Sequence, residues 1–370
     1  MKKTIAILSI VLLIAVVHSC KKTPAVTGGT VYLDLPSQSY SYFDSTTTFF
    51  NLNTGGLNVV NVNQAATLGR VLFYDTHLSV NNAISCGSCH KQALAFADNV
   101  PFSTGFQGML TKRNSIAITD LSQSSAFFWD GRENNVANLA LRPLSNHVEM
   151  GISDSVSLVS KLAALPYYSP LFINAFGDGQ VTTARISASI GIFLQAINSD
   201  NTRLDQYNAG NTAALTAQEL QGKFLFDTKY PCGSCHNSGQ GGSGGYGGGG
   251  GSTFLDIGLS VTYSDMGHGT ITGLSSDMGT FKVPDLRNVA LTAPYMHDGR
   301  FQTLSDVIDH YSHGISQSPN LDSRLKDNTG TAMQMNITDV EKQAIIAFLG
   351  TLTDDHMISD PKFSNPFKVK

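Results

Sequence analysis

The chain has 370 residues, 41% of them hydrophobic, and a formal net charge of -4 at pH 7. This length suits two domains, each large enough to bury a core of its own. The mildly acidic balance argues against nucleic acid as a partner and weakly favours a basic protein partner.

Residues 1–19 resemble a lipoprotein signal peptide. Lys2 and Lys3 precede an apolar run, Ile5 to Val17, that is too short to span a bilayer with ease. The run leads into Val17-His18-Ser19-Cys20, which resembles a bacterial lipobox and implies lipid attachment at Cys20, although His18 departs from the usual residue there. We expect a periplasmic protein that is lipid-anchored to a bacterial membrane. Ordinary secretion or an uncleaved anchor is the alternative.

Residues 20–60 are rich in Ser, Thr, Asn and Gly, which predicts a flexible tether with one strand near residues 30–35. Regular structure is expected from about Asn63 onward. Apolar residues at helical spacing then predict a short amphipathic helix: Ala66, Leu68, Val71, Leu72 and Tyr74.

The pentapeptide Cys-Gly-Ser-Cys-His occurs twice, as Cys86, Cys89 and His90 and again as Cys232, Cys235 and His236. This spacing is typical of covalent haem c attachment, because two thiols bind the porphyrin and the adjacent His ligates the iron. A shared zinc would close an unusually long loop, and a thioredoxin-like dithiol needs a βαβ setting that neither copy has. We therefore expect two covalently attached haem c groups. The fifth cysteine is Cys20, so none is left for a disulfide.

Further helices are predicted at residues 153–165 and 183–197. Two capping boxes, Thr216 with Glu219 and Thr338 with Glu341, predict where two later helices begin. The polar residues 201–211 are the expected domain boundary, and the glycine-rich residues 238–252 are the expected flexible loop.

The surroundings of the two pentapeptides repeat in the same order. A Gly-x-x-Leu-Phe segment precedes each copy, and Arg-Asn and Asp-Gly-Arg follow each copy. The expected fold class is mainly α, with two tandem cytochrome-c-like haem domains related by internal duplication. The N-terminal haem domain should comprise residues 61–205 and the C-terminal haem domain residues 206–360.

A longer ordered set of motifs resembles the bacterial dihaem cytochrome c peroxidases and their MauG-type relatives, over residues 66–352. The matching segments are Leu72-Phe-Tyr-Asp75, Ser85 to His90, Arg113-Asn114-Ser115, Phe128 to Arg132, Glu149-Met150-Gly151, Cys232 to His236, Leu286-Arg-Asn288 and Pro294 to Arg300. The resemblance implies that the His90 haem is the peroxidatic site and that the His236 haem relays electrons. It also implies that Glu149 is the catalytic acid-base and that Trp129 passes electrons between the haems. From the residues alone, the alternative for Glu149 is a solvated or helix-capping residue, and Trp129 in Phe127-Phe128-Trp129 is more often a core residue.

Two departures from the peroxidase pattern bear on the free faces of the haems. Phe106 stands in the segment where many peroxidases carry a distal His, so the first iron should be open without activation. Tyr311 stands where they carry an axial Met, as in the MauG type. Tyr311 continues the apolar stripe of Leu304, Val307 and Ile308, so a core Tyr is the alternative, and Met296, His310 and His313 remain alternative ligands. His310 and His313 lie off that stripe and are expected to be solvated. Leu139 also departs from a Gln common in the first pocket.

The resemblance further implies a calcium ion between the domains, held by Asn114, Thr292 and Pro294. The expected function is reduction of hydrogen peroxide with electrons from a small periplasmic donor, either a cytochrome c or a copper protein. The alternatives are MauG-like oxidation of a partner protein's side chains and a non-catalytic dihaem electron carrier.

Overall fold

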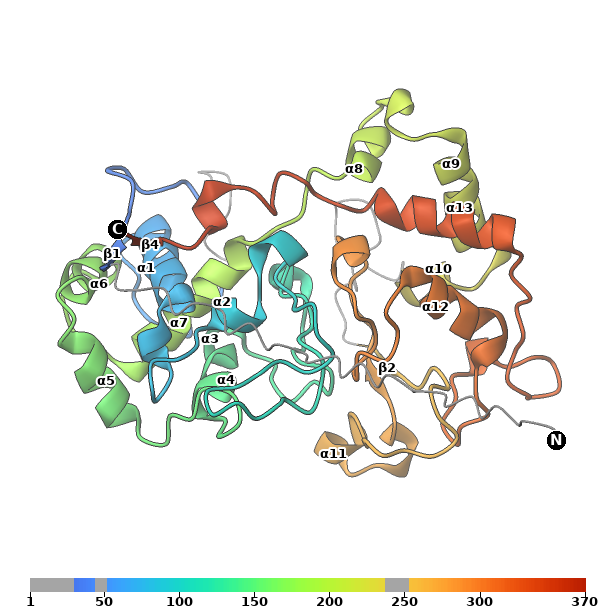
Figure 1. Ribbon diagram of the computed structural model, residues 1–370, viewed down its shortest axis with the longest axis horizontal. Helices are drawn as coiled ribbons and strands as arrows, with labels where there is room; N and C mark the ends of the chain where they lie inside the picture. The colour runs from blue at the N-terminus through green and yellow to red at the C-terminus, as the bar shows by residue number, and fades with distance from the viewer. Residues whose placement is uncertain (1–29, 44–51, 237–252) are drawn as a thin grey trace, which may run out of the picture.

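The computed structural model describes residues 30–43, 52–236 and 253–370. The predicted signal peptide, Cys20 and the whole of the glycine-rich segment, residues 238–252, lie outside the described residues. Figure 1 shows two helical halves side by side, the first from blue to green and the second from yellow to red. Sheet structure in the described ranges consists of two antiparallel pairs, β1 with β4 and β2 with β3. The expectation of a mainly helical fold is confirmed.

The first half contains α1 Val62–Tyr74, α2 Cys86–Cys89, α3 Val136–Leu139, α4 Leu141–Ser145, α5 Ser155–Ala163, α6 Tyr168–Phe176 and α7 Thr183–Ala196. The second half contains α8 Arg203–Asn208, α9 Ala217–Phe224, α10 Gly233–His236, α11 Gly269–Thr272, α12 Leu304–Asp309 and α13 Asp339–Gly350. The strands are β1 Val31–Leu33, β2 Phe254–Leu255, β3 Phe281–Lys282 and β4 Phe367–Val369.

Local sequence signals account for where the longer helices begin. The side chain of Asn61 accepts a hydrogen bond from the backbone N–H of Gln64 at the start of α1. Both predicted capping boxes are present, Thr216 with Glu219 at α9 and Thr338 with Glu341 at α13. Each box satisfies backbone donors that the first helical turn leaves unpaired. The helices predicted at residues 153–165 and 183–197 correspond to α5 and α7.

Each half is built on a close crossing between the helix before its haem motif and a later helix. A Cβ atom on Gly69 of α1 would lie 1.9 Å from the carbonyl oxygen of Ser189 in α7. A Cβ atom on Gly222 of α9 would lie 1.9 Å from the carbonyl oxygen of Ala344 in α13. Glycine is needed at both crossings because the backbones approach too closely for a side chain.

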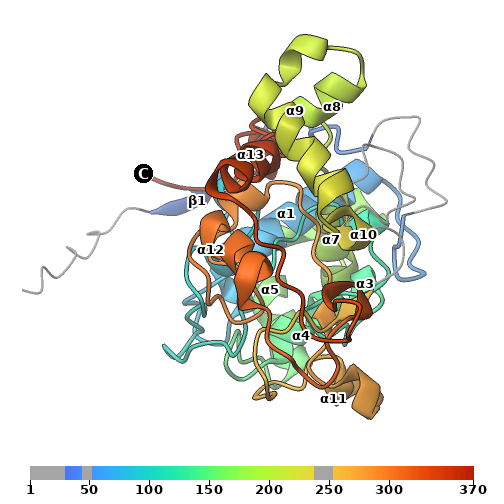
Figure 2. The same ribbon diagram turned by 90° about the vertical axis from the view of Figure 1, so that its right-hand side faces the viewer.

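Two hydrophobic clusters form the cores, one on each side of residue 200. The second cluster begins with Leu204 of α8, so α8 spans the predicted boundary between residues 205 and 206 and packs with the second half. The first cluster includes Met357 and Phe363 from the end of the chain. In Figures 1 and 2 this red segment runs from α13 back to the first half, where β4 pairs with β1.

The segment predicted to be a flexible tether is anchored to the first half at Tyr42 and Phe43, while its other described residues are exposed or half-buried. The side chain of Asn63 accepts hydrogen bonds from the backbone N–H groups of Tyr42 and Phe43, and both aromatic residues are buried in the first core. The predicted strand is present as β1. Aromatic burial here outweighs the Ser- and Thr-rich composition on which the tether was predicted.

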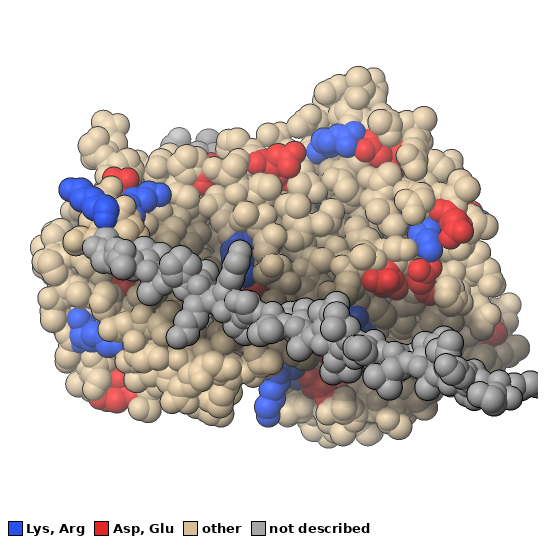
Figure 3. Space-filling view, viewed as in Figure 1, with Lys and Arg blue, Asp and Glu red and all other residues tan. Residues whose placement is uncertain are grey.

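On the face shown in Figure 3, basic and acidic side chains lie in small mixed groups separated by uncharged surface. No helix among the described residues has the length and hydropathy to span a bilayer by itself, although α5 and α6, bent by 102° at the break between them, would meet the criterion together.

Candidate haem sites

The first pentapeptide lines a cavity in the first half of the protein. Cys86, Cys89 and His90 face it, and α2 begins with a capping box between Ser85 and Ser88. Neither thiol forms a disulfide, and burial raises the pKa of Cys86 to about 12 and that of Cys89 to about 11. Two neutral thiols beside an imidazole, in a largely apolar cavity, fit a covalently attached haem c.

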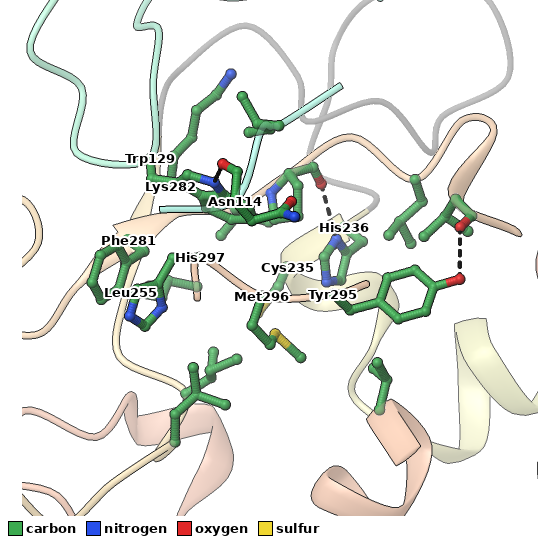
Figure 4. Close-up of a pocket in the computed structure, with 18 of the residues that line it drawn as sticks. Asn114, Trp129, Cys235, His236, Leu255, Phe281, Lys282, Tyr295, Met296 and His297 are labelled. Carbon is green, nitrogen blue, oxygen red and sulfur yellow. Dashed lines mark hydrogen bonds between the residues drawn. The ribbon is translucent and has the colours of Figure 1, made fainter. Parts of the chain in front are cut away.

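The second pentapeptide lines a separate cavity in the same way. Cys232, Cys235 and His236 face it, and burial raises the pKa of Cys232 to about 12. The donor set therefore fits a haem c here as well. Figure 4 shows Cys235 and His236 at this cavity together with Met296 and His297.

Both histidines are oriented by a backbone carbonyl. His90 Nδ1 lies 2.8 Å from the carbonyl oxygen of Phe96, and His236 Nδ1 lies 3.3 Å from that of Pro284. Because a carbonyl can only accept, each Nδ1 carries the proton and each Nε2 keeps a free lone pair. Burial lowers the pKa of His90, and it lowers that of His236 to about 4. Both rings are thus neutral imidazoles, the form that ligates iron.

Glu149 lines the first cavity and is held by a neighbouring amide. Asn146 Nδ2 donates to Glu149 Oε1 at 2.7 Å, and Asn146 Oδ1 accepts from the backbone N–H of Val148 at 2.8 Å. The second bond fixes the amide orientation and so directs the N–H₂ group at Glu149. Burial raises the pKa of Glu149, and the positive charge of Arg132 opposes that rise.

Phe106 lies beside this turn instead of facing the cavity. Its backbone N–H donates to the carbonyl of Glu149, and its ring packs over Gly151, where an added Cβ would lie 2.4 Å from the ring. The neighbouring Gly105 lines the cavity, as does the buried Leu139. The segment around Phe106 therefore places no metal-ligating side chain in the cavity.

Trp129 lines both cavities. Its indole N–H donates to the carbonyl of Asn114 at 3.0 Å, and its own carbonyl accepts from the backbone N–H of Lys282 at 2.8 Å. The turn that carries it has Phe128 at φ 65° and Gly131 at φ 70°. The bond from Lys282 attaches the turn to the second half, and the bond to Asn114 fixes the ring, which Figure 4 shows beside Asn114 and Lys282.

Tyr311 faces the second cavity together with His236, Cys232 and Cys235. The α-helix α12 ends at Asp309 and continues as a single π-helical turn from His310 to Gly314. Burial, followed by the neighbouring cysteines, raises the pKa of Tyr311 above its usual value. Met296 lines the same cavity, so the structure leaves it as an alternative ligand.

The prediction that His310 is solvated is wrong. Its side chain is buried, and Nε2 lies 3.0 Å from the carbonyl oxygen of Ile257. Its ring also packs against Phe301, so residues outside the helix cover this side of it, which the apolar stripe alone did not reveal. His313 is exposed, as expected.

Comparisons with known proteins agree with this geometry. A family model described as di-haem cytochrome c peroxidase matches residues 63–213. The methylamine utilization protein MauG of Methylorubrum extorquens is 31% identical over 292 residues, which are 78% of each chain. The cytochrome c551 peroxidase of Nitrosomonas europaea is 32% identical over 305 residues, 81% of this chain and 82% of that protein. The chain belongs to the dihaem cytochrome c peroxidase and MauG family.

Membership of this family makes the chain a haem-dependent oxidoreductase with two haem groups. Among solved structures, a MauG-like protein associated with microbial copper homeostasis is 35% identical, with a TM-score of 0.72, and the match covers 82% of this chain and 93% of that one. The diheme peroxidase BthA of Burkholderia thailandensis is 20% identical, covers 81% of this chain and 89% of its own, and has a TM-score of 0.64. BthA supports the fold alone.

The three residues that the family resemblance suggested for calcium all line the second cavity: Asn114, Thr292 and Pro294. Asn114 Nδ2 donates to the carbonyl of Val100 at 3.1 Å, so that half of its amide faces backbone. Among the described residues, no group of three or more His, Cys, Asp or Glu side chains could hold a metal ion. Calcium binding therefore remains a prediction, and the ligands would have to be uncharged oxygen atoms.

Sequence reasoning missed two residues of the dihaem centre, Asn146 and Lys282. Asn146 precedes Glu149 by three residues, a spacing that could have suggested the contact within one turn. Lys282 reaches its position only through the pairing of β3 with β2 and the contact with Trp129. No local pattern in the sequence marks it.

Proposed function

We propose that this protein reduces hydrogen peroxide at the haem held by Cys86, Cys89 and His90, with electrons supplied through the haem held by Cys232, Cys235 and His236. The observation that carries the proposal is the placement of Glu149 in the His90 cavity, with Trp129 in the wall shared with the His236 cavity. The net reaction consumes two protons and two electrons for each peroxide and yields two molecules of water.

The bound haem supplies an iron that binds peroxide and accepts electrons. Glu149 would take a proton from one oxygen of peroxide and deliver it to the departing oxygen. Asn146 donates a hydrogen bond to Oε1 of Glu149, so we assign the proton exchange to the other carboxyl oxygen, Oε2. Burial raises the pKa of the Glu149 carboxyl, which makes its protonated form easier to reach and so suits a group that must both take and return a proton.

Trp129 is proposed as the route for electrons between the haems. Its indole lies in the wall common to both cavities, and hydrogen bonds fix both the ring and its backbone. Tyr311 is proposed as the second axial ligand of the His236 iron. The phenol must lose its proton on binding, because burial favours its neutral form in the absence of metal. A phenolate would then stabilise the oxidised iron and lower its potential.

The proposed donor is a small periplasmic electron carrier, either a cytochrome c or a copper protein. The proposed location is the periplasm, with a lipid on Cys20 holding the chain to a membrane. We also propose that the two haem domains arose by internal duplication. The matching helix crossings at Gly69 and Gly222 support that origin.

A second candidate function is MauG-like oxidation of side chains in a partner protein. Tyr311 at the second cavity and the absence of a ligating side chain in the segment around Phe106 favour it, as do the 31% and 35% identities to MauG and a MauG-like protein. A non-catalytic dihaem electron carrier is the third candidate, and it requires both irons to be six-coordinate.

The decisive experiment adds one equivalent of hydrogen peroxide to the ferric dihaem protein and follows the Soret band. An unchanged band would exclude both enzymatic functions. Turnover with reduced cytochrome c then separates them, because retained peroxide reactivity with negligible turnover would favour oxidation of a partner protein. The Glu149→Gln variant should lower the rate of the peroxide reaction by about 10² to 10⁴-fold, the usual contribution of general acid-base catalysis.

A further inference from the structure

Lys282 lies where the two haem cavities meet, and nothing in the proposed reaction uses it. It belongs to β3, it lines both cavities, and its backbone N–H donates to the carbonyl of Trp129. Its ammonium reaches across to the first half, where it donates to Ser124 Oγ at 3.1 Å. Figure 4 shows Lys282 beside Trp129 and Asn114, above the ring of His236.

The ammonium of Lys282 has no carboxylate within ion-pairing distance among the described residues. The arginines that line the two cavities differ in this respect, since each forms an ion pair with an aspartate: Arg113, Arg132, Arg287 and Arg300. A desolvated ammonium that has only a hydroxyl partner is unfavourable unless an anion lies nearby. The wall between the cavities is thus short of one negative charge.

The acidic groups facing Lys282 compensate it only weakly. Asp285 attracts the ammonium, and Asp120 is electrostatically linked to Asp285 in the same wall. Burial raises the pKa of both aspartates, so both carboxyls are biased toward their neutral forms. The nearby Arg287 is already paired with Asp205. Desolvation lowers the pKa of Lys282 to about 8, which leaves it mostly charged at neutral pH.

We propose that Lys282 binds a propionate carboxylate of haem in the wall between the two cavities. Haem c attached through the cysteines keeps two propionates, and an ammonium-carboxylate hydrogen bond is shorter and stronger than a neutral one. Both cavities reach Lys282, so the carboxylate can belong to the haem on His90 or to the haem on His236. The inference goes beyond the proposed function, because it requires haem attachment but no reaction with peroxide.

The propionate contact gives Lys282 a definite effect on redox potential. A positive charge near the iron, paired with the propionate, disfavours the ferric state relative to the ferrous state. Removing the charge should therefore lower the midpoint potential of the haem whose propionate is bound. We expect a change of about tenfold in the reduction equilibrium, which is about 59 mV for one electron.

The test compares Lys282→Met, which removes the charge and keeps the length, with Lys282→Arg, which keeps the charge. Spectroelectrochemical titration of each dihaem protein gives both midpoint potentials, and resonance Raman spectra report the propionate bending modes. Lys368→Met is the control for loss of a lysine charge, since Lys368 is exposed on β4 and lines neither cavity. Lys282→Gln, which can still hydrogen-bond to Ser124, provides a second neutral variant should the Met variant fail to mature.

A lowered potential and a shifted propionate mode at one haem in the neutral variants, with both restored in Lys282→Arg, would support the inference and identify the haem. Changes at both haems would show that Lys282 bridges propionates from both. Unchanged potentials and propionate modes in a neutral variant that retains both haems would overturn the inference. Because none of these readouts involves peroxide, the proposed function could fail while this inference stands.

Discussion

The hydrogen bond from Asn146 to Glu149 allows a quantitative test of how the candidate acid-base is held. Asn146→Ala removes the donor to Glu149 Oε1 and leaves the backbone carbonyl of Asn146 free to keep its bond from the N–H of Gly151. The donor stabilises the ionised carboxylate in the wild-type protein. Its loss should raise the pKa of Glu149, adding to the effect of burial.

The size of this effect follows from the 2.7 Å bond. A hydrogen bond to a charged group contributes about 1.5 to 3 kcal/mol, and 1.36 kcal/mol corresponds to about one pH unit. Glu149 must be ionised to take a proton from peroxide, so activity is lost as pH falls through its pKa. The acidic limb of the pH–rate profile should therefore move to higher pH by about one to two units in Asn146→Ala.

Stopped-flow mixing of the ferric protein with peroxide across a pH series measures this limb directly. Above the limb the variant should approach the wild-type rate, because the ionised carboxylate is still present. Asn138→Ala, an exposed position on α3, is the control and should leave the profile in place. In a Glu149→Gln background, Asn146→Ala should have no further effect on the pH dependence. An unshifted limb in Asn146→Ala would refute the role assigned to this bond.

Three further predictions concern other parts of the fold. Tyr311→Phe should change the optical and paramagnetic-resonance spectra of the ferric His236 haem, and unchanged spectra would exclude the phenolate ligand. Trp129→Phe removes the indole and its bond to Asn114, so steady turnover with an electron donor should fall more than the single reaction with peroxide; equal losses would argue against the electron route. Gly222→Ala places a Cβ 1.9 Å from the Ala344 carbonyl and should destabilise the protein by about 1 to 3 kcal/mol or more in thermal unfolding. Gly350→Ala, with no atom within 4 Å of the added Cβ, should be neutral or stabilising by up to about 1 kcal/mol, and equal effects of the two substitutions would contradict the packing argument.

Features set by neighbouring residues were predictable from the sequence. The capping boxes at Thr216 and Thr338 operate within one helical turn, so the residues that form them are visible in order along the chain. The haem pentapeptides are local in the same sense. Their cysteines and histidines line the two cavities as expected.

Features set by contacts between distant residues were not predictable. Arg70 is buried and donates to the carbonyls of Pro361 and Lys362, close to three hundred residues away in the sequence. No sequence motif near Arg70 or near Pro361 indicates that the end of the chain packs against the first half. The burial of His310 likewise depends on residues outside its helix, because its ring contacts the carbonyl oxygen of Ile257 and the ring of Phe301.

The identical pentapeptides cannot by themselves distinguish the two haem sites, since each His is oriented by the same kind of backbone bond. The repeated turns that follow the two pentapeptides do distinguish the sites. Phe128 and Met296 both have positive φ, and Gly131 and Gly299 occupy the same place in each turn. The residue after the positive-φ position is Trp129 in one copy and His297 in the other. One scaffold used twice therefore places an indole and an imidazole in the lining that the two cavities share. Under the proposed function, the direction of electron flow would depend on the carboxyl of Glu149 at the first cavity, the phenol of Tyr311 at the second, and the charge of Lys282 at the lining that both share.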